Sequence, residues 1–258
     1  MKPELLAPVG DWETLASAIK AKADSAYFGI KWINMRSASA KNFDISELDR
    51  LMKELHKNKM KGYLTLNTLI YDHELDKVEK ILEEVKKTKV DAVIATDLAI
   101  IQMCDERGIE VHTSTQLSTS NYEAIKFLSK FASRIVLARE CTLDQIKELK
   151  RKIKKEKLNF KGKEIELETF IHGALCVAYS GRCFMSQFHN RLSANRGQCL
   201  QECRRRYNIT DVEDSRRSFI LEGEYVMSPK DLCTLPILDK LVESGINVFK
   251  IEGRAKGP

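Results

Sequence analysis

The stretch AVIATDLAIIQMCDERGIEVH (Ala92–His112) contains the structural unit that recurs along the chain. An apolar, β-prone run at Ala92–Ala95 is followed by a helical pattern at Leu98–Glu106 and by a second short strand at Glu110–His112. Two strands joined through a helix are typical of a parallel βαβ unit. We therefore expect an α/β fold with a parallel sheet.

The same alternation extends through the rest of the chain. Six further apolar runs predict strands at Leu5–Ala7, Ser25–Gly29, Tyr63–Leu66, Arg134–Leu137, Glu166–Ile171 and Val248–Ile251. Amphipathic helical patterns separate them, and the first two begin after the capping residues Asp11 and Asp44. Eight strands alternating with helices favour a closed (β/α)8, TIM-barrel-like fold over an open doubly wound sheet. We expect a single barrel domain over residues 1–258.

The end of the chain departs from this pattern. Only four residues, AKGP, follow Arg254, so the eighth outer helix is expected to be missing or truncated. An apolar seam between the first and seventh helices would then be exposed unless another chain covers it.

Composition is typical of a globular protein. Apolar residues make up 43% of the chain and charged residues 31%. The first residues, MKPELLAPVGDW, lack the basic and apolar regions of a signal peptide, and no apolar run is long enough to cross a bilayer. We therefore expect a cytoplasmic protein without a membrane partner, in a compartment where thiols stay reduced.

Five of the seven cysteines fall between the seventh and eighth predicted strands. This cysteine-rich insertion, residues 172–233, carries Cys176, Cys183, Cys199, Cys203 and Cys233. Such a group indicates metal or redox chemistry, whereas Cys104 lies at an apolar helical position typical of a buried side chain. The intervals match no zinc knuckle, and spacing alone leaves zinc and an iron–sulfur cluster open. The pattern of Tyr207–Ser228 predicts a β-hairpin packed beside the cysteines.

Polar residues follow most of the predicted strands and should gather at the mouth of the barrel, because loops after parallel strands face one end. The catalytic candidates are His172, Glu140, Arg139 and Glu252, and the substrate-binding candidates are Arg36, Asn67, Gln116 and Arg254. The arginines would suit a phosphate or a dianionic carboxylate, unless they pair with Glu140 and Glu252. In the insertion, Arg196 and Arg204 suit contacts with RNA phosphates.

Four motifs carry a resemblance to a known family. They are ETFIHGALCVAYSGRCFMS (Glu168–Ser186), ANRGQCLQECRRRY (Ala194–Tyr207), SPKDLC (Ser228–Cys233) and KIEGR (Lys250–Arg254). They resemble the collagenase-like peptidase family U32, which also includes proteins of tRNA, rRNA and ubiquinone hydroxylation. The stretches ELLAPVGDWETL, AYFGIKWINMR and VLARE agree with it as well, so the resemblance covers essentially the whole chain.

The resemblance implies a cofactor and a function. A four-iron, four-sulfur cluster would be held by Cys176, Cys183, Cys199 and a fourth cysteine, for which we favour Cys233 over Cys203. Zinc is the alternative metal. The implied activity is hydroxylation of an RNA base, of the tRNA wobble 5-hydroxyuridine type, with prephenate as a co-substrate.

Two other functions stay open at this point. The family name implies a peptidase, although the sequence contains neither an HExxH zinc motif nor a GxSxG nucleophile elbow. A third interpretation is a non-catalytic, cluster-bearing chain that acts in a heterodimer with a related partner chain.

Overall fold

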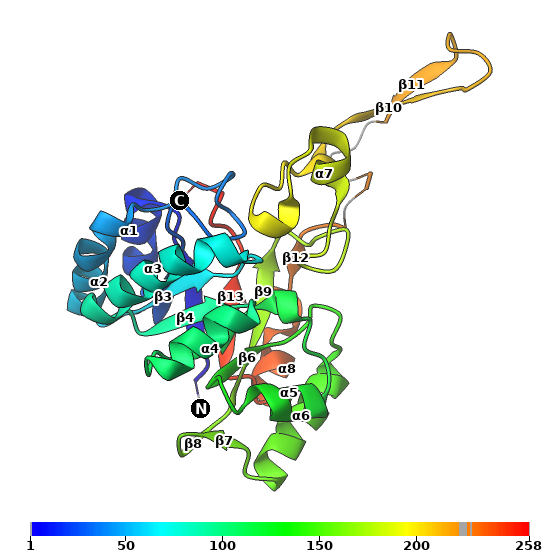
Figure 1. The fold of residues 1–258 in the computed structure, drawn as a ribbon. Coiled ribbons are helices and arrows are strands. Elements are labelled where there is room, and N and C mark those ends of the chain that lie inside the picture. Colours follow the sequence, from blue (N-terminus) through cyan, green and yellow to red (C-terminus); the bar gives the residue numbers. More distant parts are fainter. Residues whose placement is uncertain (1, 222–225, 228, 258) are drawn as a thin grey trace.

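The computed structural model describes residues 2–221, 226–227 and 229–257. Its centre is a closed barrel of eight parallel strands (Figure 1). They are β1 (Glu4–Pro8), β2 (Ser25–Phe28), β3 (Lys61–Leu66), β4 (Ala92–Ala95), β5 (Val111–Thr113), β6 (Arg134–Val136), β9 (Glu166–Gly173) and β13 (Val248–Ile251). Each pairs with the next, β6 pairs with β9, and β13 closes the ring on β1. The predicted TIM-barrel-like fold is confirmed.

Helices follow the barrel strands and cover the outside of the barrel. They are α1 (Trp12–Lys20), α2 (Leu48–Lys57), α3 (Leu75–Lys87), α4 (Leu98–Glu106), α5 (Tyr122–Leu128), α6 (Leu143–Lys155) and α8 (Leu238–Glu243). The Asp11 carboxylate accepts a hydrogen bond from the Thr14 backbone N–H at the start of α1. Asp44 instead caps a short 3₁₀ turn, η1 (Ile45–Glu47), that leads directly into α2. Buried apolar side chains such as Leu51, Leu82 and Ile101 fill the space between helices and strands.

The barrel interior is apolar in the middle and charged toward the amino ends of its strands. A cluster of Leu6, Tyr27, Tyr63, Ala92, Ile94 and Val248 fills the middle. Below it, the Arg134 guanidinium is only 2% exposed and donates to both carboxylate oxygens of Glu4, at 3.0 and 2.9 Å. Glu166 and Glu168 also pair with Arg134. The sequence analysis did not predict this ion network.

The segment between β9 and β13 forms the insertion. It contains α7 (Met185–Asn190), the strand pair β10 (Tyr207–Thr210) and β11 (Ser218–Leu221), and β12 (Leu232–Cys233), which pairs antiparallel with β9. Residues 222–225 and 228 of the predicted hairpin segment lie outside the described residues. The hairpin extends away from the barrel, beyond α7 (Figure 1). The predicted hairpin forms, with β10 antiparallel to β11, and its side chains Ile209 and Ile220 are exposed; its packing beside the cysteines stays a prediction.

The chain after β13 was expected to lack its outer helix. Within the described part of this segment, residues 252–257, no helix forms. The exposed apolar seam that we expected between the first and seventh helices stays a prediction. A separate short ribbon, β7 (Asn159–Phe160) with β8 (Lys163–Glu164), precedes β9 at the opposite end of the barrel from the insertion (Figure 1).

Candidate active site at the barrel mouth

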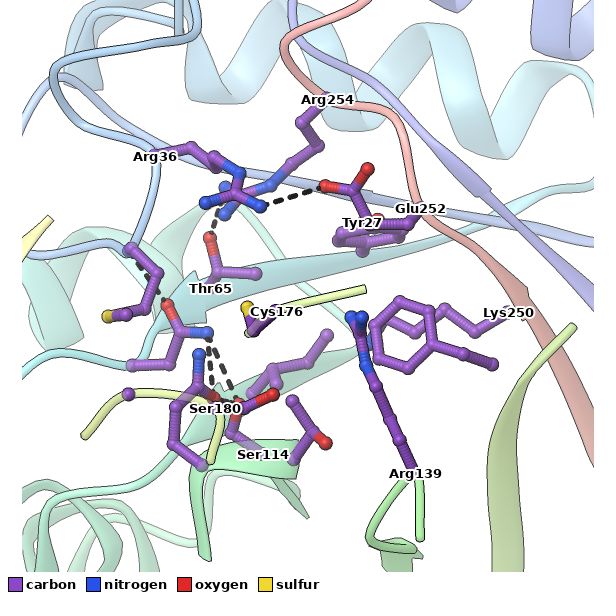
Figure 2. A pocket seen from close by; sticks show the side chains of 17 residues that line it. Tyr27, Arg36, Thr65, Ser114, Arg139, Cys176, Ser180, Lys250, Glu252 and Arg254 are labelled. Carbon is purple, nitrogen blue, oxygen red and sulfur yellow. Dashed lines mark hydrogen bonds and ion pairs between the residues drawn. The ribbon is translucent and has the colours of Figure 1, made fainter. Parts of the chain in front are cut away.

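A cavity of about 70 Å³ lies at the carboxyl ends of the strands, inside the mouth of the barrel. Its walls come from the loops after β2, β3, β5, β6 and β13 and from the start of the insertion (Figure 2). The lining includes the predicted residues Arg36, Asn67, Gln116, Arg139, Glu252 and Arg254, together with Cys176. For these polar residues, a position directly after a predicted strand therefore correctly predicted that they lie at the mouth.

Arg36 and Glu252 form the ion pair of this cavity. An Arg36 Nη lies 3.1 Å from Glu252 Oε1, and the two side chains are 18% and 11% exposed. Burial alone would lower the pKa of Arg36, but Glu252 raises it above its ordinary value. Arg36 is therefore held as a cation, and part of its charge is already neutralised.

Arg254 is the most deeply buried arginine of the mouth, at 5% exposure. Its guanidinium donates to Thr65 Oγ1 at 2.7 Å and to Asn34 Oδ1 at 3.2 Å. Within the described residues it forms no ion pair with a carboxylate, and burial lowers its pKa to about 10. Gly29 gives it room, since a Cβ there would lie 2.6 Å from the guanidinium. The fold therefore keeps a weakly compensated cation in the cavity wall.

Arg139 approaches the cavity from the loop after β6. Its Nη1 donates to the Ala174 carbonyl at 2.6 Å, and its guanidinium carbon lies 4.1 Å from the centre of the Phe170 ring. Its Nε is buried and has no hydrogen-bond partner, which is costly unless a ligand accepts from it. Burial lowers the pKa of Arg139, only partly offset by Cys176 and Glu252. An anion bound here would satisfy a donor that the protein leaves open.

Asn67, Ser114 and Gln116 form a neutral polar group on another wall. The Asn67 amide nitrogen donates to Ser114 Oγ at 3.2 Å and to Gln116 Oε1 at 3.3 Å, and its oxygen accepts from the Met35 N–H at 3.2 Å. These bonds fix the Asn67 side chain. The group can orient a polar ligand without adding charge.

The charge of the cavity is strongly unbalanced. Its charged lining consists of Arg36, Arg139, Lys250 and Arg254 against Glu252; because Lys250 also pairs with the buried Glu168, two positive charges are in excess. Low local dielectric strengthens such a field. The site therefore favours an anionic ligand.

Four predicted residues do not line this cavity. His172 ends β9 with its ring exposed, and Glu140 is exposed after β6. Arg196 donates to Glu74 and to the Leu69 carbonyl, and Arg204 pairs with Asp231. The expected pairing of the mouth arginines thus holds for Glu252 but not, within the described residues, for Glu140. The assigned roles of these residues stay predictions.

The clustered cysteines lie beside the mouth. All seven cysteines are free thiols, and Cys176 lines the cavity. Burial raises the pKa of Cys203, and negative charge on Cys199, Cys176 and Cys183 raises it further, so these four thiols share one neighbourhood. Cys233 is exposed on β12, opposite His172 in the strand pairing. By contrast, Cys104 is fully buried in α4, as its apolar position predicted.

The fit of these thiols to a metal group can be judged from their chemistry and arrangement. Among the described residues, no three His, Cys, Asp or Glu side chains converge closely enough to hold a metal ion. Thiolates around a four-iron cage stand farther apart than ligands around one ion, and thiolates are the ordinary ligands of such a cage. The donor set therefore fits the chemistry of a cluster, although the side chains do not form a closed single-ion site.

Comparison with known proteins decides the family. The family model described as peptidase family U32 matches residues 10–258. The chain belongs to peptidase family U32. A collagenase of Porphyromonas gingivalis is 45% identical to this U32 chain over 99% of its length and 62% of the relative. The tRNA hydroxylation protein P1 of Bacillus subtilis is 38% identical, over 99% of this chain and 59% of the relative.

The U32 chain therefore spans about three-fifths of the length of these curated relatives. A solved structure of another U32 peptidase superposes with a TM-score of 0.62 at 9% identity, covering 100% of this chain and 95% of that one, which supports the fold. In the part of the chain that the structure describes, no helix is long and apolar enough to span a membrane.

Proposed function

We propose that this U32 chain is a cytoplasmic iron–sulfur protein that acts in hydroxylation of an RNA base, most specifically in tRNA. The observation that carries the proposal is the meeting of clustered thiols with an electropositive cavity: Cys176 lines the same cavity as Arg36, Arg139 and Arg254. A relative named for tRNA hydroxylation supports the substrate class. A cofactor at the mouth is where a barrel enzyme would use it.

Cys176, Cys183 and Cys199 would hold the cluster, with Cys233 as the predicted fourth ligand and Cys203 as the competing one. When bound, a four-iron cluster supplies single-electron transfer. Zinc in the same thiols would supply structural support or Lewis acidity instead. The surroundings of Cys203 support it as the fourth ligand, because Cys176, Cys183 and Cys199 lie near enough to raise the pKa of its thiol.

The mouth contains two neighbouring cavities, one suited to an anionic metabolite and one to an RNA base. The arginine-lined cavity of about 70 Å³ would bind the anionic oxygen-donating metabolite, for which prephenate is the candidate. A neighbouring cavity of about 370 Å³ shares Met35, Asn67, Gln116 and Gly181 with it and adds Phe184 and Arg182. Phe184 is 64% exposed and offers a ring on which a base can stack. The larger cavity therefore suits the RNA base.

Nucleoside mass spectrometry of RNA from a deletion strain tests this function. Loss of a 5-hydroxypyrimidine, restored by the intact gene but not by an Arg254→Gln variant, is the expected result. A matched variant, Arg151→Gln on the exposed face of α6, should restore the modification fully. Unchanged 5-hydroxypyrimidine content in the deletion strain would contradict the proposal.

A peptidase is the second candidate, favoured by the collagenase among the relatives. Ser180 lines the mouth cavity, but no histidine among the described residues lines it with Ser180 as a general base. A peptidase would cleave gelatin as a pure protein, independently of iron. If the chain works only with a related partner chain, it would show neither activity alone and would co-purify with that chain.

A further inference from the structure

Lys250 is a buried amine at the floor of the mouth cavity that the proposed function leaves unused. It lies in β13, two residues before Glu252, and its side chain is 5% exposed. Its neighbours in the strand are the apolar residues Phe249 and Ile251, so the charge stands within an otherwise apolar run. Lys250 nevertheless lines the cavity that opens at the mouth (Figure 2).

Two aromatic rings and other cations surround the amine. Nζ lies 4.4 Å from the centre of the Tyr27 ring and 5.4 Å from that of Phe170. Burial lowers the pKa of Lys250, and Arg254 and Arg134 lower it further, against the opposing effect of Glu168. A desolvated lysine beside other cations is the arrangement that activates amines toward carbonyl compounds.

Glu168 supplies a proton acceptor for this amine. Its Oε1 lies 2.8 Å from Lys250 Nζ, and the residue is fully buried. Its Oε2 has no hydrogen-bond partner and lies 3.5 Å from an Arg134 nitrogen. One oxygen therefore contacts the lysine while the other keeps an open lone pair.

Two guanidinium groups flank the same aromatic rings as the amine. The Arg254 guanidinium carbon lies 5.6 Å from the Tyr27 ring centre, and that of Arg139 lies 4.1 Å from the Phe170 ring centre. Guanidinium groups bind carboxylates, and the open Nε of Arg139 requires an acceptor. A ligand that satisfies both features carries a carboxylate and, close to it, a carbonyl group.

We propose that Lys250 forms an imine with a small carboxylate that bears a ketone, a 2-oxo acid, bound at the mouth. The inference rests on the proposed function for using this cavity as the metabolite site. Glu168 takes a proton from the ammonium, and Nζ then forms a bond to the carbonyl carbon. The carbonyl oxygen leaves as water once it has received two protons: the one that Glu168 took from the ammonium, and a second that Nζ loses as the carbinolamine becomes the imine. The product is a protonated imine, and the step needs neither oxidant nor reductant.

Lys150 provides a matched control, because it is also a buried lysine. Its side chain is 6% exposed, and Nζ donates to Glu164 at 2.6 Å and to Asn247 at 2.9 Å. It belongs to α6 and does not line the mouth cavity. Burial and ion pairing alone would give Lys150 and Lys250 the same reactivity.

Reductive trapping tests the imine. The whole chain is incubated with pyruvate and sodium cyanoborohydride, and the modified lysine is identified by peptide mass spectrometry. The expected result is one reduced pyruvate adduct at Lys250 and none at Lys150. Pyruvamide, which lacks the carboxylate, should label Lys250 about tenfold less or weaker still, because it forfeits charge-assisted bonds to the arginines. No adduct at Lys250, or equal labelling of both lysines, would overturn the proposal.

A conservative variant gives a second test that the imine forms at Lys250. Lys250→Arg keeps a cation opposite Glu168 but cannot form an imine, so trapping at this position should disappear, whereas Lys150→Arg should leave it unchanged. The mapping in the unaltered protein needs neither variant, RNA nor cluster. If trapping succeeds while 5-hydroxypyrimidine content proves independent of the gene, the RNA function fails and the imine stands. If the modification depends on the gene but no adduct forms at Lys250, the imine fails and the RNA function stands.

Discussion

The two ends of the barrel use the same residue types in opposite ways. At the amino end, the Arg134 guanidinium meets the carboxylates of Glu4, Glu166 and Glu168. At the mouth, three arginines share the cavity wall with the single carboxylate of Glu252, and Lys250 pairs with the buried Glu168. One arginine is surrounded by carboxylates at the amino end, whereas three arginines share one carboxylate at the mouth. The difference indicates that Arg134 stabilises the fold, whereas the mouth arginines are available to bind an anionic ligand.

Removing Arg134 should give the largest loss of stability. Arg134→Met leaves the partly buried Glu4 carboxylate without its cation and leaves the buried Glu168 with Lys250 alone, which costs about 3–5 kcal/mol of unfolding free energy. Urea unfolding measures the loss. Arg151→Met is the matched control, because Arg151 is 63% exposed and pairs with Glu148 on the surface of α6, where solvent screens the pair and its loss should change stability little. Equal losses in the two variants would show that the buried Arg134 network stabilises the fold no more than a surface ion pair does.

Acid should weaken the same network. Burial alone would raise the pKa of Glu4, but Arg134, Ser25 and Tyr63 outweigh it and lower the pKa from 4.5 to about 2. The stabilisation is therefore present above about pH 4.5 and is lost as the pH falls toward about 2. This shift corresponds to roughly 3 kcal/mol.

Urea midpoints measured across that range for the wild type and Glu4→Gln give the test. The wild type should lose stability more steeply than the variant as the solution is acidified. Parallel curves would show that the Glu4 carboxylate does not contribute.

Arg139 at the mouth should give the smallest change in stability and a clear change in binding. Since burial lowers the pKa of Arg139, its charge is unfavourable in the empty cavity, and Arg139→Gln should alter the unfolding free energy by less than about 1 kcal/mol. Pyruvate affinity, measured by calorimetry, should fall about tenfold. A loss of stability as large as that of Arg134→Met would mean that both ends serve the fold alike.

The sequence predicted the barrel because its strands are short buried runs between helices with clear caps. It also predicted much of the mouth, since polar residues after parallel strands must face one end. The sequence did not predict which side chains point into the cavity: Arg139 and Glu140 both follow β6 and His172 lies near the end of β9, yet of the three only Arg139 lines the cavity. That direction depends on the path of each loop, which strand patterns do not contain.

The sequence analysis also did not predict the ion partners of charged residues that lie inside strands. Arg134 and Lys250 belong to apolar runs that predict burial, and only the barrel's closure brings Glu4 and Glu168 to them. A buried charge within a predicted strand is a usable sign that an ion partner lies across the barrel.

Iron and acid-labile sulfide content, with an electron paramagnetic resonance spectrum of anaerobically prepared protein, tests the central claim most directly. The account predicts about four iron and four sulfide per chain. Serine variants then identify the fourth ligand, because the cluster should be lost with either Cys233→Ser or Cys203→Ser but retained with the other. A protein that holds no iron or sulfide after anaerobic reconstitution, or that holds zinc alone, would contradict the account.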